Sequence, residues 1–267
     1  PVPRLARRVG ATPFFAYDRG LITQRIAELR ETLPDGLGLN YAMKANPMPA
    51  VVQHVAGLVD GIDVASAQEM SVALDTPVEP DRVSFAGPGK TEAEIESAVA
   101  AGIVLTLESA TEMERVAAAA AAQGLVAPVA VRVNPDFELK TSGMRMGGGA
   151  KPFGVDAEDV PAMLARMGSL PSLAFRGFHI FGGSQNLRAD ALVEAQTRTV
   201  ELAVELAAHA PGGVAHLNIG GGFGIPYFPG DAPLDLAPVA DNLARLVDRV
   251  RAELGDARLI LELGRYI

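Results

Sequence analysis

Charged side chains stand at or near the carboxyl ends of several short apolar segments of this sequence. Strands that are buried on both faces rarely carry such groups unless the charge has a partner or a chemical task. Each has a plain structural explanation when it is taken singly, such as a lysine that reaches solvent, an aspartate that caps a helix or a satisfied core histidine. Together they indicate one site, formed by Lys44, Asp63, Arg132, His179 and Glu262.

Carbanion stabilisation by pyridoxal phosphate is a chemistry that needs this set. A buried lysine is expected to have a lowered pKa, so Lys44 would offer a free amine to an aldehyde. Glycines at 220–222 lack Cβ atoms, which lets backbone N–H groups surround a phosphate. A carboxylate such as Glu262 can keep a pyridine nitrogen protonated and make the ring a strong electron sink. Phosphate binding alone is the milder alternative, and it leaves Lys44 and Glu262 unexplained.

The motifs around these residues resemble those of the fold-type III pyridoxal-phosphate decarboxylases, the diaminopimelate/ornithine/arginine decarboxylase family. They occur in the family's order and extend over nearly the whole chain, which makes the resemblance specific. The matching segments are YAMKAN (41–46), DVASAQE (63–69), VRVN (131–134), GGSQ (182–185), GGGFG (220–224) and ELGR (262–265).

The resemblance implies a role for each matching residue. Lys44 would form the Schiff base with the cofactor, and Asp63 and Glu69 would shape the site near it. Arg132 corresponds to the family's arginine on the fifth strand, and no metal is expected. The phosphate would be bound by Ser184 and by the turn of Gly220, Gly221 and Gly222, while Glu262 would contact the pyridine nitrogen and Gly264 and Arg265 would lie near the phosphate or the substrate.

Two positions depart from the family pattern. Phe181 stands where the family usually has a histidine that stacks on the cofactor ring, and an aromatic face can still stack there. His179 lies two residues earlier, on the same face of the strand, and is a second candidate for that place. Leu263 replaces the proline of the family's E-P-G-R, a minor change in the turn.

The leading hypothesis from this resemblance is α-decarboxylation of an amino acid. The substrate would be diaminopimelate- or ornithine-like, or an aminoacyl group bound to a carrier protein. FHIFGGSQNL and GGGFGIPYFPGD are most similar to the subgroup of exopolysaccharide/exosortase-associated and carrier-bound aminoacyl decarboxylases. The alternatives are an amino-acid racemase of the same fold, which typically places an arginine against the pyridine nitrogen, and a non-catalytic pyridoxal-phosphate homeostasis protein.

Eight short apolar segments must position these residues, and helical segments separate them. This alternation predicts a parallel sheet, and eight is the number of a closed (β/α)8 barrel, whose chemistry lies at the carboxyl ends of its strands. By resemblance the barrel is of the alanine racemase-like type. The expected strands are 36–44, 61–66, 82–87, 102–109, 128–134, 175–181, 215–221 and 258–263, and the clearest expected helices are 91–102, 110–124, 190–210 and 235–255.

The expected organisation is an N-terminal strand–helix appendage over 1–35 and a cofactor-binding barrel over 36–267. The appendage would contain a strand at 14–18 and a helix at 21–33. A doubly wound sheet is the competing architecture. Against it, the glycine-rich segment 218–224 comes at the seventh expected strand, whereas a dinucleotide-binding fingerprint belongs at the first.

Composition excludes several other classes of protein. A net charge of −9 and no basic patch interleaved with aromatics argue against a nucleic-acid partner. The absence of cysteine excludes disulfides and thiolate metal sites, and the four histidines lack metal-motif spacing. No apolar run is long enough to span a membrane, and the N-terminus does not resemble a signal peptide. A cytoplasmic enzyme acting on a small molecule is the expectation.

By resemblance, the family continues past the eighth strand into a C-terminal β-domain, which this chain is expected to lack. That domain would contribute a cysteine and an acidic residue across a dimer interface, so a homodimer is expected at full length. With no helix after the eighth strand, the barrel is also expected to expose an apolar strip on its outer face.

Overall fold

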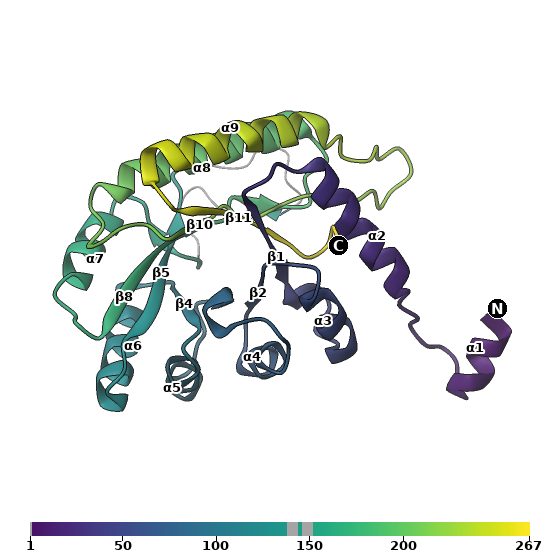
Figure 1. Ribbon diagram of the computed structural model, residues 1–267, viewed down its shortest axis with the longest axis horizontal. Coiled ribbons are helices and arrows are strands. Elements are labelled where there is room, and N and C mark those ends of the chain that lie inside the picture. Colours follow the sequence, from purple (N-terminus) through teal and green to yellow (C-terminus); the bar gives the residue numbers. More distant parts are fainter. Residues whose placement is uncertain (1, 138–143, 146–151) are drawn as a thin grey trace.

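The computed structural model describes residues 2–137, 144–145 and 152–267. Its main sheet is a closed ring of eight parallel strands in the order β4-β3-β2-β1-β11-β10-β8-β5, and β5 pairs back onto β4 (Figure 1). Closure of the ring confirms the barrel and excludes the doubly wound sheet. The strands of the ring are β1 (Leu37–Ala42), β2 (Gly61–Val64), β3 (Val83–Phe85), β4 (Val104–Leu107), β5 (Ala127–Asn134), β8 (Leu173–Ile180), β10 (His216–Asn218) and β11 (Arg258–Leu263).

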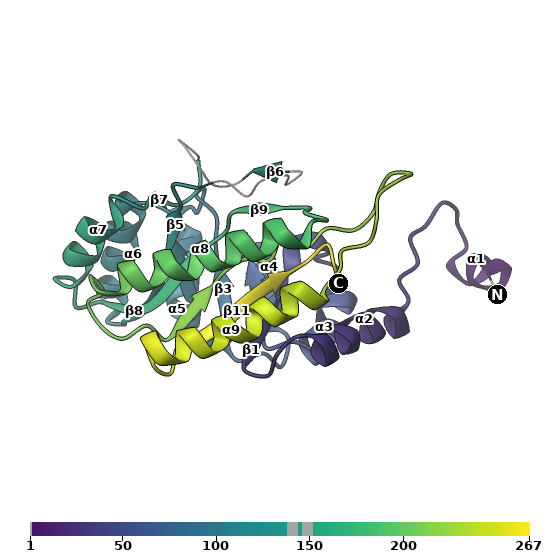
Figure 2. The same ribbon diagram turned by 90° about the horizontal axis from the view of Figure 1, so that it is seen from above.

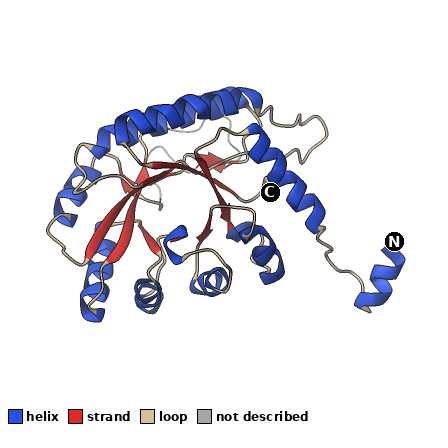
Figure 3. Ribbon diagram, viewed as in Figure 1, coloured by secondary structure: helices blue, strands red, loops and turns tan. Residues whose placement is uncertain are grey.

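Helices surround the strands on the outside (Figure 3). Their ends follow ordinary capping chemistry: α5 begins with a reciprocal capping box between Thr91 and Glu94 and ends at Gly102 in the left-handed conformation. The helices are α1 (Val2–Val9), α2 (Arg19–Thr32), α3 (Pro49–Ala56), α4 (Ala67–Leu74), α5 (Glu92–Ala101), α6 (Ala110–Gln123), α7 (Val160–Met167), α8 (Ala189–Ala207) and α9 (Ala237–Leu254).

Short elements complete the description. Two 3-10 turns, η1 (Met43–Ala45) and η2 (Pro80–Arg82), lie after β1 and before β3. The two-residue strand β7 (Val155–Asp156) adds to the edge of β5, and β6 (Met144–Arg145) pairs with β9 (Gly183–Ser184) in an antiparallel bridge. The expected strand 36–44 therefore ends at Ala42, and Lys44 lies in the turn that follows it.

The N-terminal segment differs from the expectation. Residues 14–18 form no strand, because they pair with no other segment in the described part of the chain. Helix α2 instead packs against the barrel, with Ile26 and Leu29 fully buried in the core. It lies in the ring of helices between α9 and α3 (Figure 1), at the place where a helix after the eighth strand would be. The expectation of an exposed apolar strip there is wrong. Among the described helices, α1 alone stands away from the body (Figure 2).

Polar side chains dominate the inside of the barrel. Branched aliphatic residues usually fill such interiors. Here the apolar core lies mainly between the strands and the helices, while a polar layer occupies the centre of the ring. This layer comprises Asn40, Asp63, Ser84, Thr106, His179 and Asn218.

Candidate active site

Lys44 and Glu262 form an ion pair at the carboxyl end of the barrel. Strands β1 and β11 are neighbours, and their register places Asn40 beside Glu262. The turn η1 then carries Lys44 over the end of β1, so that its Nζ lies 3.0 Å from Glu262 Oε1. The counter-charge of Glu262, 218 positions further along the sequence, therefore explains why a lysine can stand at the end of a buried strand.

The electrostatics of Lys44 differ from the expectation. The Glu262 carboxylate is the largest influence and raises the pKa of Lys44 above its ordinary value, although burial opposes the shift. The expected lowering by burial is wrong because 59% of the side chain is exposed and because its counter-charge is so close. Glu262 rather than Asp63 is the ion-pair partner of Lys44. An amine held in this way is an ammonium at neutral pH and must leave Glu262 and lose a proton before it can act as a nucleophile.

The second carboxylate oxygen of Glu262 faces the inside of the barrel. His179 Nε2 lies 3.2 Å from Glu262 Oε2, and Asn218 Nδ2 donates to the same oxygen at 3.5 Å. Burial of Glu262 favours the neutral acid, but Lys44 and His179 outweigh it and hold the pKa of Glu262 well below its usual range. Glu262 is thus an oriented carboxylate: Oε2 is held from β8 and β10, and Oε1 is presented to Lys44.

A pocket of about 740 Å³ opens above this pair. It combines an apolar wall from α2 and β1 with polar groups from the loops after β8, β10 and β11. Arg265 marks its rim, where Nη1 donates to the Tyr227 hydroxyl at 2.8 Å. The predicted site residues that line this pocket are Lys44, Phe181, Ser184, Gly222, Glu262, Gly264 and Arg265.

The glycine turn after β10 is required by close packing. A Cβ on Gly221 would lie 2.1 Å from the Glu262 carbonyl oxygen, and one on Gly220 would lie 2.3 Å from the Phe181 ring. Gly220 and Gly222 also have positive φ values, of 67° and 80°. Within the described residues, the backbone N–H groups of Gly221 and Gly222 donate to no other protein group. Two free donors beside Ser184 fit a phosphate.

Phe181 and His179 lie at different depths. Phe181 lines the pocket together with Lys44, whereas His179 is buried beneath Glu262 and lines the interior of the barrel. Phe181 turned outward and His179 over the pocket would have contradicted the sequence interpretation. The structure does not show that arrangement. Phe181 therefore stays the candidate for the aromatic face of the site.

Asp63 lies below the pocket, inside the barrel. Its Oδ1 accepts hydrogen bonds from Ser84 Oγ and, at 3.4 Å, from Asn40 Nδ2, while its Oδ2 has no partner. Burial and the nearby Glu262 raise the pKa of Asp63 to about 7. Glu69, which the resemblance placed near the lysine, accepts a hydrogen bond from the backbone N–H of Ala65 at 2.7 Å and so holds the turn before α4.

Arg132 is buried and paired with Glu108 at 2.8 Å. The Glu108 carboxylate also accepts the backbone N–H groups of Gly87 and Gly154, so it ties three segments together around the arginine. Arg132 is not among the residues that line the pocket of Lys44, and its guanidinium is oriented by Glu108.

Sequence reasoning missed several of these contacts. Asn218 had a usable signal, because it ends β10 two residues before the glycine turn. Glu108 likewise follows β4 directly, among residues predicted to be a strand end. Tyr227 carried no signal beyond its position in an aromatic loop, since its contact with Arg265 depends on how two loops fold over the barrel.

The family model for the pyridoxal binding domain of pyridoxal-dependent decarboxylases matches residues 19–267. The chain belongs to this family. Pyridoxal phosphate is the cofactor of this pyridoxal binding domain, and the lysine, the carboxylate and the free donors of the glycine turn fit that cofactor. Among the described residues no group of three or more histidines, aspartates and glutamates could hold a metal ion.

Curated relatives and solved structures agree with this assignment. The pyridoxal binding domain is 31% identical over 258 residues to an L-glutamyl-[BtrI acyl-carrier protein] decarboxylase of Niallia circulans, covering 96% of this chain and 60% of that protein. It is 36% identical to the diaminopimelate decarboxylase of Aquifex aeolicus, covering 98% of this chain and 61% of the relative. The structure of Helicobacter pylori diaminopimelate decarboxylase complexed with L-lysine superposes with a TM-score of 0.84 at 28% identity, over 96% of this chain and 64% of that one.

The chain thus spans about three fifths of the length of these relatives. In the part of the chain that the structure describes, no helix has the length and apolar character needed to cross a bilayer.

Proposed function

We propose that the whole protein is a pyridoxal-phosphate-dependent decarboxylase that removes the α-carboxylate of an amino acid. The observation that carries this proposal is the oriented Glu262 carboxylate beside Lys44. When bound, pyridoxal phosphate supplies an electron sink for the electron pair that departing CO₂ leaves on the α-carbon. A carboxylate opposite the pyridine nitrogen strengthens that sink, whereas the arginine typical of racemases would weaken it.

Each residue of the site has a role in this proposal. The Lys44 amine would bind the cofactor's aldehyde carbon after it leaves Glu262, and the Glu262 carboxylate would hold a proton on the pyridine nitrogen. Ser184 and the N–H groups of Gly221 and Gly222 would bind the phosphate. Phe181 would supply an apolar face for the ring and exclude water from it. CO₂ leaves as a neutral molecule, and the α-carbon takes up one proton in its place.

His179 and Asn218 act on this reaction through Glu262. Both contact Oε2, so the carboxylate cannot rotate freely, and Oε1 stays directed at the pocket. We therefore assign them as positioning residues for the carboxylate.

The substrate class is also part of this proposal. The two curated relatives described above are named for different substrates, a carrier-bound glutamyl group and diaminopimelate. Both names describe decarboxylation of an amino acid or of an aminoacyl group, which supports this general class. The rim pair of Arg265 and Tyr227 offers a cation and a hydroxyl to a polar substrate side chain.

The test is a substrate panel on the full-length, cofactor-loaded protein. Diaminopimelate, ornithine, lysine, arginine, glutamate and carrier-linked glutamate would each be incubated with the protein, and released CO₂ and the product amine would be measured. Lys44→Ala serves as the inactive control. Loss of CO₂ from one of these substrates is the expected result. Exchange of the α-hydrogen without CO₂ would instead show a racemase, and binding without any turnover would show a homeostasis protein.

A cytoplasmic homodimer is the assembly that fits this proposal. Two exposed aromatic side chains near the pocket support a protein interface there, since Phe15 is 90% exposed and Phe228 is 74% exposed. Light scattering of the full-length protein would test the dimer, and a monomer at micromolar concentration would contradict it.

A further inference from the structure

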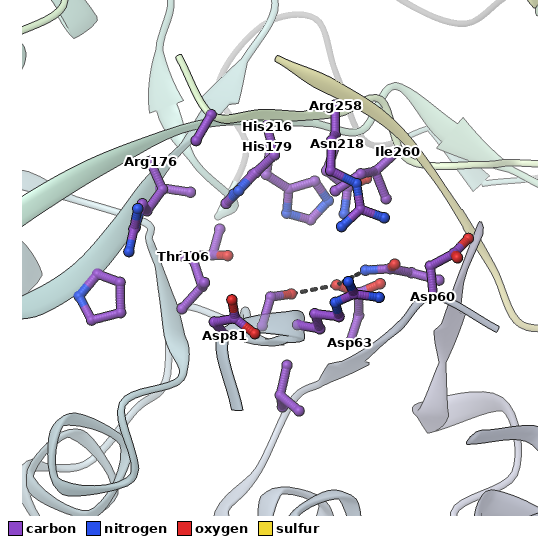
Figure 4. A pocket seen from close by; sticks show the side chains of 18 of the residues that line it. Asp60, Asp63, Asp81, Thr106, Arg176, His179, His216, Asn218, Arg258 and Ile260 are labelled. Atoms are coloured by element: carbon purple, nitrogen blue, oxygen red, sulfur yellow. Dashed lines mark hydrogen bonds between the residues drawn. The ribbon is translucent and has the colours of Figure 1, made fainter. Parts of the chain in front are cut away.

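A second cavity, of about 250 Å³, lies inside the barrel at the amino ends of the strands, away from the pocket of Lys44 (Figure 4). This is below the roughly 300–1,000 Å³ typical of pockets for small organic molecules. Its lining includes several charged side chains. In Figure 4, His216 and Arg258 lie along one wall, Asp63 and Asp81 lie opposite, and Arg176 lies at one side.

Arg176 reaches this cavity because of a β-bulge. Val129 of β5 pairs with Phe175 of β8, but the next residue of β5 pairs with Gly177, so Arg176 is an extra residue with no partner on β5. Bulges of this kind redirect side chains. Counting alternate residues back from the inward-facing His179 would place Arg176 on the outer face, yet it lines the cavity.

The bulge depends on a glycine. Gly177 has a φ of 151°, and a Cβ at this position would lie 1.8 Å from the backbone oxygen of His216. Strands β8 and β10 can therefore approach this closely only with glycine at 177. Phe175 turns outward at the bulge and packs edge-to-face on Phe178, with ring centroids 5.3 Å apart.

Arg258 completes a row across three neighbouring strands, in which two guanidiniums flank His216. His216 pairs in register with Arg258 on one side and with Gly177, next to Arg176, on the other. Arg82, the last residue of η2 and next to β3, lines the same cavity. Among the residues that the structure describes, none of these three guanidiniums has a hydrogen-bond or ion-pair partner.

The acids of the cavity do not neutralise this row. Asp60 is already engaged, since its Oδ2 lies 2.8 Å from Arg30 Nη2 and accepts the backbone N–H of Leu39. Asp63 lies deeper, is hydrogen-bonded to Ser84, and has a pKa raised to about 7. Asp81 is the one remaining carboxylate of the lining, so the mouth of the cavity carries an excess of positive charge.

We infer that this cavity binds a small oxyanion of about the size of phosphate, held by Arg176 and Arg258 on either side of His216 and by Arg82 from the turn η2 on the facing wall. Guanidiniums bind oxyanions through paired, charge-assisted hydrogen bonds. The cavity is large enough for such an ion with a few waters and too small for a typical organic ligand. The site is separate from the cofactor's phosphate, which would lie at the opposite end of the strands.

His216 gives this inference a direct reporter. Burial and the charges of Arg176, Arg258 and His179 lower the pKa of His216 to about 4. An anion bound between the two arginines would offset their positive potential at His216. Opposite charges within a few ångströms shift a pKa by about one to three units, so the pKa of His216 should rise by that amount when the site is filled.

The experiment uses the cofactor-loaded protein, so that the cofactor's own phosphate site is occupied. The imidazole signals of the four histidines are followed by NMR against pH at constant ionic strength, and His216→Gln identifies the relevant signal. Inorganic phosphate is the probe and chloride is the reference. Sulfate tests whether any tetrahedral oxyanion suffices, and acetate tests whether a planar carboxylate does.

A double variant, Arg176→Gln with Arg258→Gln, tests the site, and Arg251→Gln on the exposed face of α9 is the matched control. In the double variant, phosphate should bind at least about tenfold more weakly and should no longer shift His216. Retained cofactor absorbance and an unchanged thermal midpoint would show that both variants fold. An unmoved His216 pKa, or phosphate affinity equal in the double variant and in Arg251→Gln, would mean an adventitious ion only and would overturn the inference.

Discussion

Replacement of Glu262 by glutamine tests the proposed chemistry most directly. The substitution keeps the size of the side chain and removes its charge. In the structure, Glu262 is 7% exposed, pairs with Lys44 at 3.0 Å and lies 3.2 Å from His179. An amide at this position could not hold a proton on the pyridine nitrogen, so the electron sink would be weakened while the pocket kept its shape.

The magnitude can be bounded from comparable groups. Removing one preorganised electrostatic contact from an active site typically reduces kcat by about 10²–10³, or roughly 2.7–4 kcal/mol. The substitution should also lower the free energy of unfolding, because the Glu262 side chain is only 7% exposed and its charge is paired with Lys44. Removing one partner of a fully buried ion pair costs about 3–5 kcal/mol, and the 59% exposure of Lys44 places the expected loss below that range.

The assay compares CO₂ release, cofactor content and thermal midpoint in the wild type and in Glu262→Gln. Glu253→Gln is the matched control, since it removes an equivalent charge from an exposed pair with Arg249. Turnover should fall about 10²–10³-fold in Glu262→Gln alone, with cofactor still bound. A glutamine variant that turns over within threefold of the wild type would refute the assigned role of this carboxylate.

Four further predictions follow from the same geometry. Borohydride should fix the cofactor on Lys44, and reduction onto another lysine in Lys44→Ala would contradict the assignment. Phe181→Ala should weaken cofactor retention by about 1–3 kcal/mol through lost apolar burial, measured by dialysis against free cofactor. Asp63 binds its proton more tightly folded than unfolded, so the free energy of unfolding should fall as pH rises from about 4 to about 7, and Asp63→Asn should flatten that dependence in denaturant titrations. Leu29→Ala should lower the free energy of unfolding by about 2–5 kcal/mol, whereas a loss under 1 kcal/mol would show that α2 is not part of the core.

The fold could be predicted because its signals are local. Alternating apolar and helical segments gave all eight strands of the ring, most within two or three residues of their ends. The expectation for residues 14–18 was wrong because the strand propensity of their aromatic residues does not reveal whether a neighbouring strand is available. The place of α2 could not be predicted either, since α9, one of its two neighbouring helices, is separated from it by most of the chain.

The residues of the site could be predicted from the sequence, whereas their pKa shifts and ion-pair partners could not. Motif order brought Lys44 and Glu262 together correctly, because neighbouring strand ends meet at one edge of a barrel. The direction of the Lys44 pKa was wrong because burial was weighed without its counter-charge. Asp63 was placed beside the lysine, whereas strand register sets it one layer deeper, on Ser84. The β-bulge at Arg176 had one weak signal in the sequence, Gly177 within an expected strand, and this signal does not say which side chain the bulge redirects.

The position of α2 also bears on how the chain folds. The last strand, β11, pairs with the first, β1, and α2 fills the outer wall between the helices that flank that seam. Helix α2, which precedes every strand of the ring, must therefore wait for the last strand of the ring before its apolar face is fully covered. Contacts of such high sequence separation form slowly because the whole intervening loop must close first. Ring closure at this seam should be the late step of folding, and a circular permutant that makes α2 follow β11 directly should fold faster with the same final structure.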